Sequence, residues 1–231
     1  MDIDTFFFGI YPYIAGTVFL VGSLVRFERE QFGWKADSSQ LLDRKTLRLG
    51  SNLFHVGILA LFAGHFVGLL TPHGVFRSLG VSDLTHQVIA IGAGAVFGLT
   101  CMVGGVLLWR RRMFNPRIRA VTRFMDLVIL DWLLVTLALG LATLPVSIGH
   151  ALRGDASVMI ALAEWAQSVV TFRADASLLA GVDPIFKIHL FFGMTVFLLF
   201  PFSRLVHIWS APLTYLARPY QVVRAKYVRY R

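Results

Sequence analysis

Four histidines lie within two long apolar stretches of this chain. They are His55 and His65 in residues 49–71, and His189 and His207 in residues 184–209. Both stretches are long and apolar enough to cross a bilayer. Because ionisable side chains are costly at membrane depth, a histidine there suggests a functional role. Two membrane helices with two histidines each predict four axial ligands for two haems.

The opposite directions of the two helices predict how the histidines pair. Depth in the bilayer matches His55 with His207 and His65 with His189. No two histidines on one helix are close enough to share a zinc or copper ion, because such sites hold their ligands at about 2.0–2.3 Å. The alternative is that each histidine is a hydrogen-bonded residue of the helix interior.

The spacing of the histidines adds a constraint. On a continuous helix, His189 and His207 would share one face about 27 Å apart, since eighteen residues return to the same face. His55 and His65 would be about 15 Å apart and about 80° short of whole turns. The spacing therefore predicts that residues 49–71 bend, tilt or rotate their ligands.

Two arginines are candidate partners for haem propionates. Arg204 lies one turn before His207, and Arg112 lies in the basic run of residues 110–123. A guanidinium binds a carboxylate through two parallel hydrogen bonds, which suits this role. For Arg204 the alternative is a side chain that extends to the membrane interface.

The composition is that of a membrane protein. Of the 231 residues, 56% are hydrophobic and 15% are charged, against about a quarter charged in soluble domains. We predict one all-α membrane domain over residues 1–231. The single cysteine, Cys101, excludes an intrachain disulfide and a cysteine-ligated cluster. The sequence has no C-x-x-C-H motif, so the expected haems are b-type.

Five membrane-spanning helices are predicted from hydropathy and length. They cover residues 5–25, 49–71, 86–109, 124–148 and 184–209. The first is predicted to be a retained helix, because Asp2 and Asp4 stand where a signal peptide has basic residues. Gly104 and Gly105 in the third favour close helix packing, with clearance for a porphyrin as the alternative.

Basic residues predict the orientation in the membrane. They gather in residues 26–48, in 110–123 and after residue 209, whereas the opposite face has only Arg77, Arg153, Arg173 and Lys187. The positive-inside rule then places the N-terminus outside and the C-terminus in the cytoplasm. The net charge of +9 is thus explained by topology and lipid contact, and no nucleic-acid partner is expected.

Several motifs resemble one known family. SNLFHVGILALFAGHFVGLLTPH, GGVLLWRRRMFNPRIRA, WAQSVVTF and LLFPFSRLVHIWSAP are similar to the cytochrome b (gamma) subunit of membrane-bound respiratory nitrate reductase. The resemblance extends over nearly the whole chain. It implies two b haems, a proximal one bound by His55 and His207 and a distal one bound by His65 and His189. It also implies a place in the cytoplasmic (inner) membrane of a prokaryotic cell.

The resemblance also implies an activity. Members of the family oxidise quinol near the distal haem and pass electrons through the distal and then the proximal haem to an iron–sulfur subunit and a molybdenum subunit, which reduces nitrate in the cytoplasm. This chain is therefore expected to be the quinol-oxidising subunit of a quinol:nitrate oxidoreductase. The basic tail after residue 209 is expected to dock on a soluble partner, or else on anionic lipid. The alternatives are the related cytochrome b of a sulfite- or heterodisulfide-reductase-type complex, or a haem-free anchor or transporter.

The quinol site is expected at His86 and His65. Some members of the family have a lysine near the position of His86. Histidine donates hydrogen bonds and, with an ordinary pKa of about 6.5, accepts protons near neutral pH. The alternative is that His86 is a cap at the protein surface; His73 and Asp83 are weaker candidates for the site.

Overall fold

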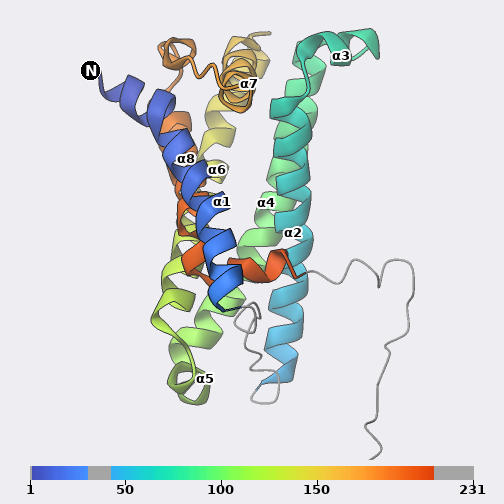
Figure 1. The fold of residues 1–231 in the computed structure, drawn as a ribbon. Helices are drawn as coiled ribbons and strands as arrows, with labels where there is room; N and C mark the ends of the chain where they lie inside the picture. Colours follow the sequence, from blue (N-terminus) through green and yellow to red (C-terminus); the bar gives the residue numbers. More distant parts are fainter. Residues whose placement is uncertain (1, 31–42, 211–231) are drawn as a thin grey trace, which may run out of the picture.

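The computed structural model describes residues 2–30 and 43–210, and every regular element in these ranges is a helix (Figure 1). Five helices are long and apolar enough to cross a membrane, as predicted. They are η1–α1 (Thr5–Ile10 and Tyr11–Arg29), α2 (Arg44–Leu70), α4 (Asp83–Phe114), α6 (Phe124–Leu152), and α8 with η4 (Pro184–Leu199 and Phe200–Phe202). The all-helical class is confirmed.

Most of these helices extend beyond the predicted spans, because polar caps rather than hydropathy decide where a helix begins. The side chain of Asp43 accepts a hydrogen bond from the backbone N–H of Thr46 at 3.3 Å and starts α2. Ser82 accepts from the N–H of Thr85 at 3.1 Å and starts α4. The helices therefore start several residues before 49 and 86.

Each long helix packs against the next in a series. α2 packs on α4, α4 on α6, α6 on α8, and α8 on α1. The short helices α3 (His73–Ser78) and α7 (Ser157–Val170) lie at one end of the molecule, and α5 (Pro116–Ala120) lies at the other (Figure 1). α2 and α8, which contain three of the four histidines, are not among these closely packed pairs of helices.

Glycines bring α2 and α4 into near-backbone contact. A Cβ atom at Gly57 would lie 2.6 Å from the backbone nitrogen of Cys101, and one at Gly104 would meet the backbone nitrogen of Phe54. A Cβ atom at Gly105 would meet a side-chain atom of Leu134 on α6 at 2.7 Å. Gly104 and Gly105 thus serve close helix packing, the first of the two interpretations of these glycines.

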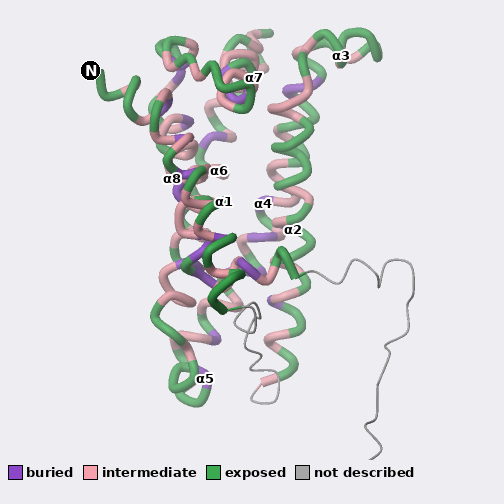
Figure 2. The backbone as a smooth tube through the Cα atoms, viewed as in Figure 1, coloured by how far each residue is buried: buried purple, intermediate pink, exposed green. Residues whose placement is uncertain are grey.

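α7 joins three elements at its end of the molecule. The indole Nε1 of Trp165 donates to the backbone oxygen of Phe8 at 2.9 Å, and the amide of Gln167 donates to the oxygen of Leu69 at 3.1 Å. Phe186 of α8 belongs to the same buried cluster as Trp165. Figure 2 shows buried positions on α7 beside the exposed surface of much of α2.

The last predicted helix, residues 184–209, is wrong beyond residue 202. α8 ends at Leu199, and the backbone becomes extended at Ser203 (φ −116°, ψ 178°) before η5 (Arg204–Ile208). Pro201 lacks an N–H and its ring clashes with the carbonyl four residues earlier, which ends a helix. Figure 1 shows the final segment turning across the bundle toward α2. The spacing argument from one continuous helix therefore fails for His207.

Candidate haem sites

The structure brings the four histidines together in two pairs. The imidazole ring centroids of His55 and His207 are 6.4 Å apart, and those of His65 and His189 are 6.1 Å apart. We call His55 and His207 the inner pair, and His65 and His189 the outer pair. In each pair, α2 supplies one ring, while α8 or η5 supplies the other.

Each of the four rings has the same hydrogen bond. Its Nδ1 atom contacts a backbone carbonyl oxygen: His55 to Ser51 at 2.7 Å, His65 to Leu61 at 2.7 Å, His189 to Thr136 at 3.0 Å and His207 to Arg204 at 2.6 Å. A carbonyl oxygen only accepts hydrogen bonds, so Nδ1 must carry the proton. Nε2 therefore keeps its lone pair, which is the form of imidazole that binds a metal.

Local structure explains how these bonds form. His55 and His65 each reach the carbonyl one turn earlier in α2. His189 instead reaches across to α6, and a Cβ atom at Gly140 would lie 2.9 Å from its ring carbon Cε1. Gly140 thus leaves room for the ring, and the Thr136 carbonyl orients it. Sequence reasoning predicted neither contact. The available signal was an isolated glycine inside an apolar helix, which usually has a packing reason.

The geometry fits two haems that are each held by two imidazoles. Rings that bind one metal through nitrogens at about 2 Å on opposite sides have centroids about 6 Å apart, close to the spacing of both pairs. His55 and His65 are exposed on α2, among exposed apolar side chains that include Leu59, Phe62 and Phe66. A large apolar group with a metal at its centre would be covered by such a surface.

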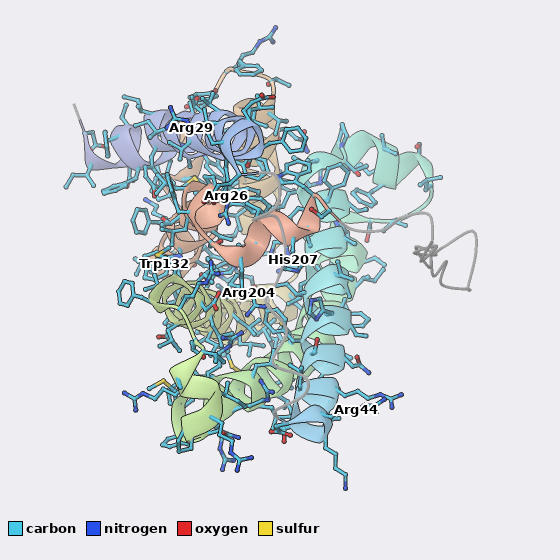
Figure 3. The ribbon with its side chains drawn as sticks, turned by 60° about the horizontal axis from the view of Figure 1, so that its bottom comes forward. Arg26, Arg29, Arg44, Trp132, Arg204 and His207 are labelled. Carbon is cyan, nitrogen blue, oxygen red and sulfur yellow. The ribbon has the colours of Figure 1, made fainter. Side chains whose placement is uncertain are left out.

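The two candidate propionate partners meet at one carboxylate. Asp126 of α6 lies 3.5 Å from Nη1 of Arg112 and 3.9 Å from Nη1 of Arg204. All three side chains are mostly buried, with 15%, 25% and 17% of the Arg112, Arg204 and Asp126 side chains exposed. Two guanidinium groups on one carboxylate leave a net positive charge, which favours a further anionic group beside His207. Figure 3 shows Arg204 and His207 on the same segment.

His86 is buried, with 8% of its surface exposed, so it is not a surface cap. Its ring stacks on Phe76 with centroids 4.1 Å apart. A Cβ atom at Gly68 would lie 3.5 Å from its Nε2 atom, which places the ring against α2 about one turn beyond His65 rather than beside it. Within the described residues, Nδ1 of His86 is buried without a hydrogen-bond partner.

The two weaker candidates lie together near His86. Nδ1 of His73 is 3.5 Å from Oδ1 of Asp83, and the other carboxylate oxygen of Asp83 pairs with Arg77. Arg77 is 61% exposed, so this group reaches the surface at the α3 end of the molecule. Residues 211–231 of the predicted docking tail lie outside the described part of the chain, as do residues 31–42.

The sequence matches the family described as "Nitrate reductase gamma subunit" over residues 4–226. It is 54% identical to the respiratory nitrate reductase 1 gamma chain of Escherichia coli K12, covering 97% of this chain and 99% of the relative. It is 46% identical to the respiratory nitrate reductase 2 gamma chain of the same organism (97% and 98% covered) and 42% identical to the nitrate reductase gamma chain of Bacillus subtilis 168 (94% and 96% covered). With five membrane-length helices, this chain is a membrane protein that belongs to the nitrate reductase gamma subunit family.

Proposed function

We propose that this chain is the dihaem cytochrome b subunit of a respiratory nitrate reductase, in which it oxidises quinol at the outer side of the membrane. The observation that supports this most is the pairing of four imidazoles, at 6.4 and 6.1 Å, with every Nδ1 bound to a carbonyl. The relatives' names give the nitrate reductase context.

The inner pair would hold the proximal haem, and the outer pair would hold the distal haem. The hydrogen bond at each Nδ1 orients its ring and increases the basicity of Nε2. When bound, the two haems supply one-electron redox chemistry. Arg112 and Arg204 would bind carboxylates of the proximal group, with Asp126 holding both guanidiniums in place.

His86 would bind quinol and accept a proton from it. Its Nδ1 atom is a buried polar atom with no hydrogen-bond partner among the described residues, and a quinol hydroxyl would satisfy it. Phe76 fixes the plane of the ring by stacking. The proton would leave His86 through neighbouring polar side chains. His73 contacts Asp83, and Asp83 pairs with the exposed Arg77 at the surface.

The orientation follows from the distribution of charge. The outer pair and His86 would lie toward the outside, at the end formed by α3 and α7. The inner pair would lie toward the basic cytoplasmic face, where an iron–sulfur subunit and a molybdenum subunit would dock.

Haem analysis of the purified complex tests this proposal. The pyridine haemochrome spectrum is expected to give two b haems per chain, and a quinol analogue is expected to reduce them. A chain with no haem, or with one, would rule out the assignment of the two pairs. Two haems that quinol cannot reduce would rule out the quinol-oxidising role alone.

The variant His86→Ala tests the quinol site. We expect the quinol oxidation rate to fall on the order of 10²-fold, the contribution typical of a positioned acid or base, while both haems remain. The matched control is His150→Ala, which removes an imidazole that pairs with Asp183 at the end of α6. Steady-state assays with a quinol analogue measure the rate, and optical spectra measure the haems. An unchanged rate in His86→Ala would exclude this residue from the site.

A further inference from the structure

The break in the last helix creates a need for hydrogen-bond donors. In a continuous helix, the carbonyl of Pro201 would accept from the backbone N–H of Leu205. Here that N–H donates to the side-chain oxygen of Ser203 at 3.2 Å instead. Ser203 is buried, with 2% of its surface exposed, so carbonyl oxygens at this point need partners from elsewhere in the protein.

Arg26, near the end of α1, supplies those partners. Its Nη1 atom donates to the carbonyl oxygen of Pro201 at 2.7 Å and to that of Ser203 at 2.8 Å. One charged group thus bonds both sides of the turn that separates η4 from η5. Figure 3 shows Arg26 next to this segment, which continues to His207.

Two further residues of α1 pack against the same segment. Phe19 stacks on Trp209 with ring centroids 5.6 Å apart and meets Phe200 edge-on at 4.8 Å. Gly22 lets the ring of Pro201 approach so closely that a Cβ atom on the glycine would lie 2.8 Å from Cγ of the proline. Because Phe19, Gly22 and Arg26 are three and four residues apart, they share one face of α1. We call these three residues the α1 clasp.

We propose that the α1 clasp positions His207, so that a helix with no haem ligand of its own sets the geometry of the inner pair. The clasp contacts the chain on both sides of His207, at Pro201 and Ser203 before it and at Trp209 after it. The ligand itself lies on a five-residue 3₁₀ segment, which is too short to hold a fixed direction alone. Arg26 and Gly22 are therefore positioning residues. This inference rests on the proposed role of His207 as a haem ligand.

Substitutions in the clasp, made in the complete purified complex, test the inference. Arg26→Met removes both hydrogen bonds and is expected to shift the reduction potential and the EPR g values of the inner haem, or to lower the haem content from two per chain toward one. The outer haem is expected to keep its parental values. Arg26→Lys is expected to restore the parental signals, because an ammonium group can still donate to two carbonyls.

Matched controls separate positioning from general effects. Gly22→Ala brings a methyl group against Pro201 and is expected to perturb the inner haem selectively, although alanine favours a helix. Gly16→Ala adds the same methyl group on the same helix where nothing lies within 4 Å, and Arg29→Met removes an exposed charge one turn away. Both controls are expected to match the parent.

The outcomes are distinct. Parental inner-haem signals in both Arg26→Met and Gly22→Ala would overturn the role of the clasp, and so would an equal loss of both haems. If Arg26→Met does not accumulate, Gly22→Ala against Gly16→Ala decides the question. A parent complex with fewer than two haems would instead overturn the proposed function.

Discussion

Under the proposed function, replacing His189 by alanine is expected to halve the haem content, from two haems per chain to one, and to abolish quinol-driven nitrate reduction by the complex. Nε2 of His189 would be one of two ligands to the outer haem. The ring packs against Gly140 and donates a hydrogen bond to the Thr136 carbonyl. Alanine has no imidazole, so His65 would be the remaining ligand to the outer haem. The inner pair lies on other turns of α2 and beyond the α8 break, so its haem is expected to remain.

Pyridine haemochrome analysis counts the haems, and an optical redox titration shows which one is lost. The reciprocal variant His207→Ala serves as the control, because it is expected to remove the inner haem and to keep the outer one. Two redox steps retained in His189→Ala, or the loss of the same step in both variants, would contradict the assignment of the pairs.

Replacing Gly104 by valine is expected to destabilise the membrane domain strongly. At this position a Cβ atom would meet the backbone of Phe54, and backbone cannot rotate out of the way as a flexible side chain can. Relief requires α2 and α4 to move apart, which would also displace the two histidines on α2. Overpacking that forces backbone to shift costs about 1–3 kcal/mol, and occasionally more.

Thermal unfolding in detergent, followed by circular dichroism, measures the change in stability. The control is Gly92→Val on the same helix, where nothing lies within 4 Å of an added Cβ atom. Both variants place a β-branched residue in α4, so a difference between them reports the contact with α2 alone. Equal stability of the two variants would show that α2 and α4 can move apart without a change in the free energy of unfolding.

Much of the architecture follows from simple patterns. Long apolar stretches predict the five helices, because backbone polar groups in lipid must be satisfied within a helix. Opposite helix directions predict which histidines share a depth, and the structure places the rings of those same pairs near one another. Both arguments need only the positions of residues along the chain.

The features that sequence reasoning missed depend on contacts between distant segments. Pro201 lies within a stretch apolar enough for a continuous helix, yet the break there is held by Arg26, 175 residues earlier. In the sequence, Arg26 resembles any basic residue at the end of a membrane helix. Gly140 likewise matters only because the ring of His189 is packed against it. Hydropathy measures the preference of a residue for an apolar environment. It does not predict which backbone groups a side chain will contact.

Each of the four Nδ1 atoms bonds to a main-chain oxygen, and Nδ1 of His55 also lies 3.2 Å from the side-chain oxygen of Ser51. No point substitution can delete a peptide carbonyl, so mutation cannot remove these acceptors one at a time as it could remove aspartates. A carbonyl also draws the ring proton less strongly than a carboxylate does, so each imidazole would donate only moderate electron density to a metal. Nearby charges such as the arginine pair at Asp126, and side-chain contacts such as that of Ser51 with His55, would then be the features through which substitution tunes the redox properties of the two sites.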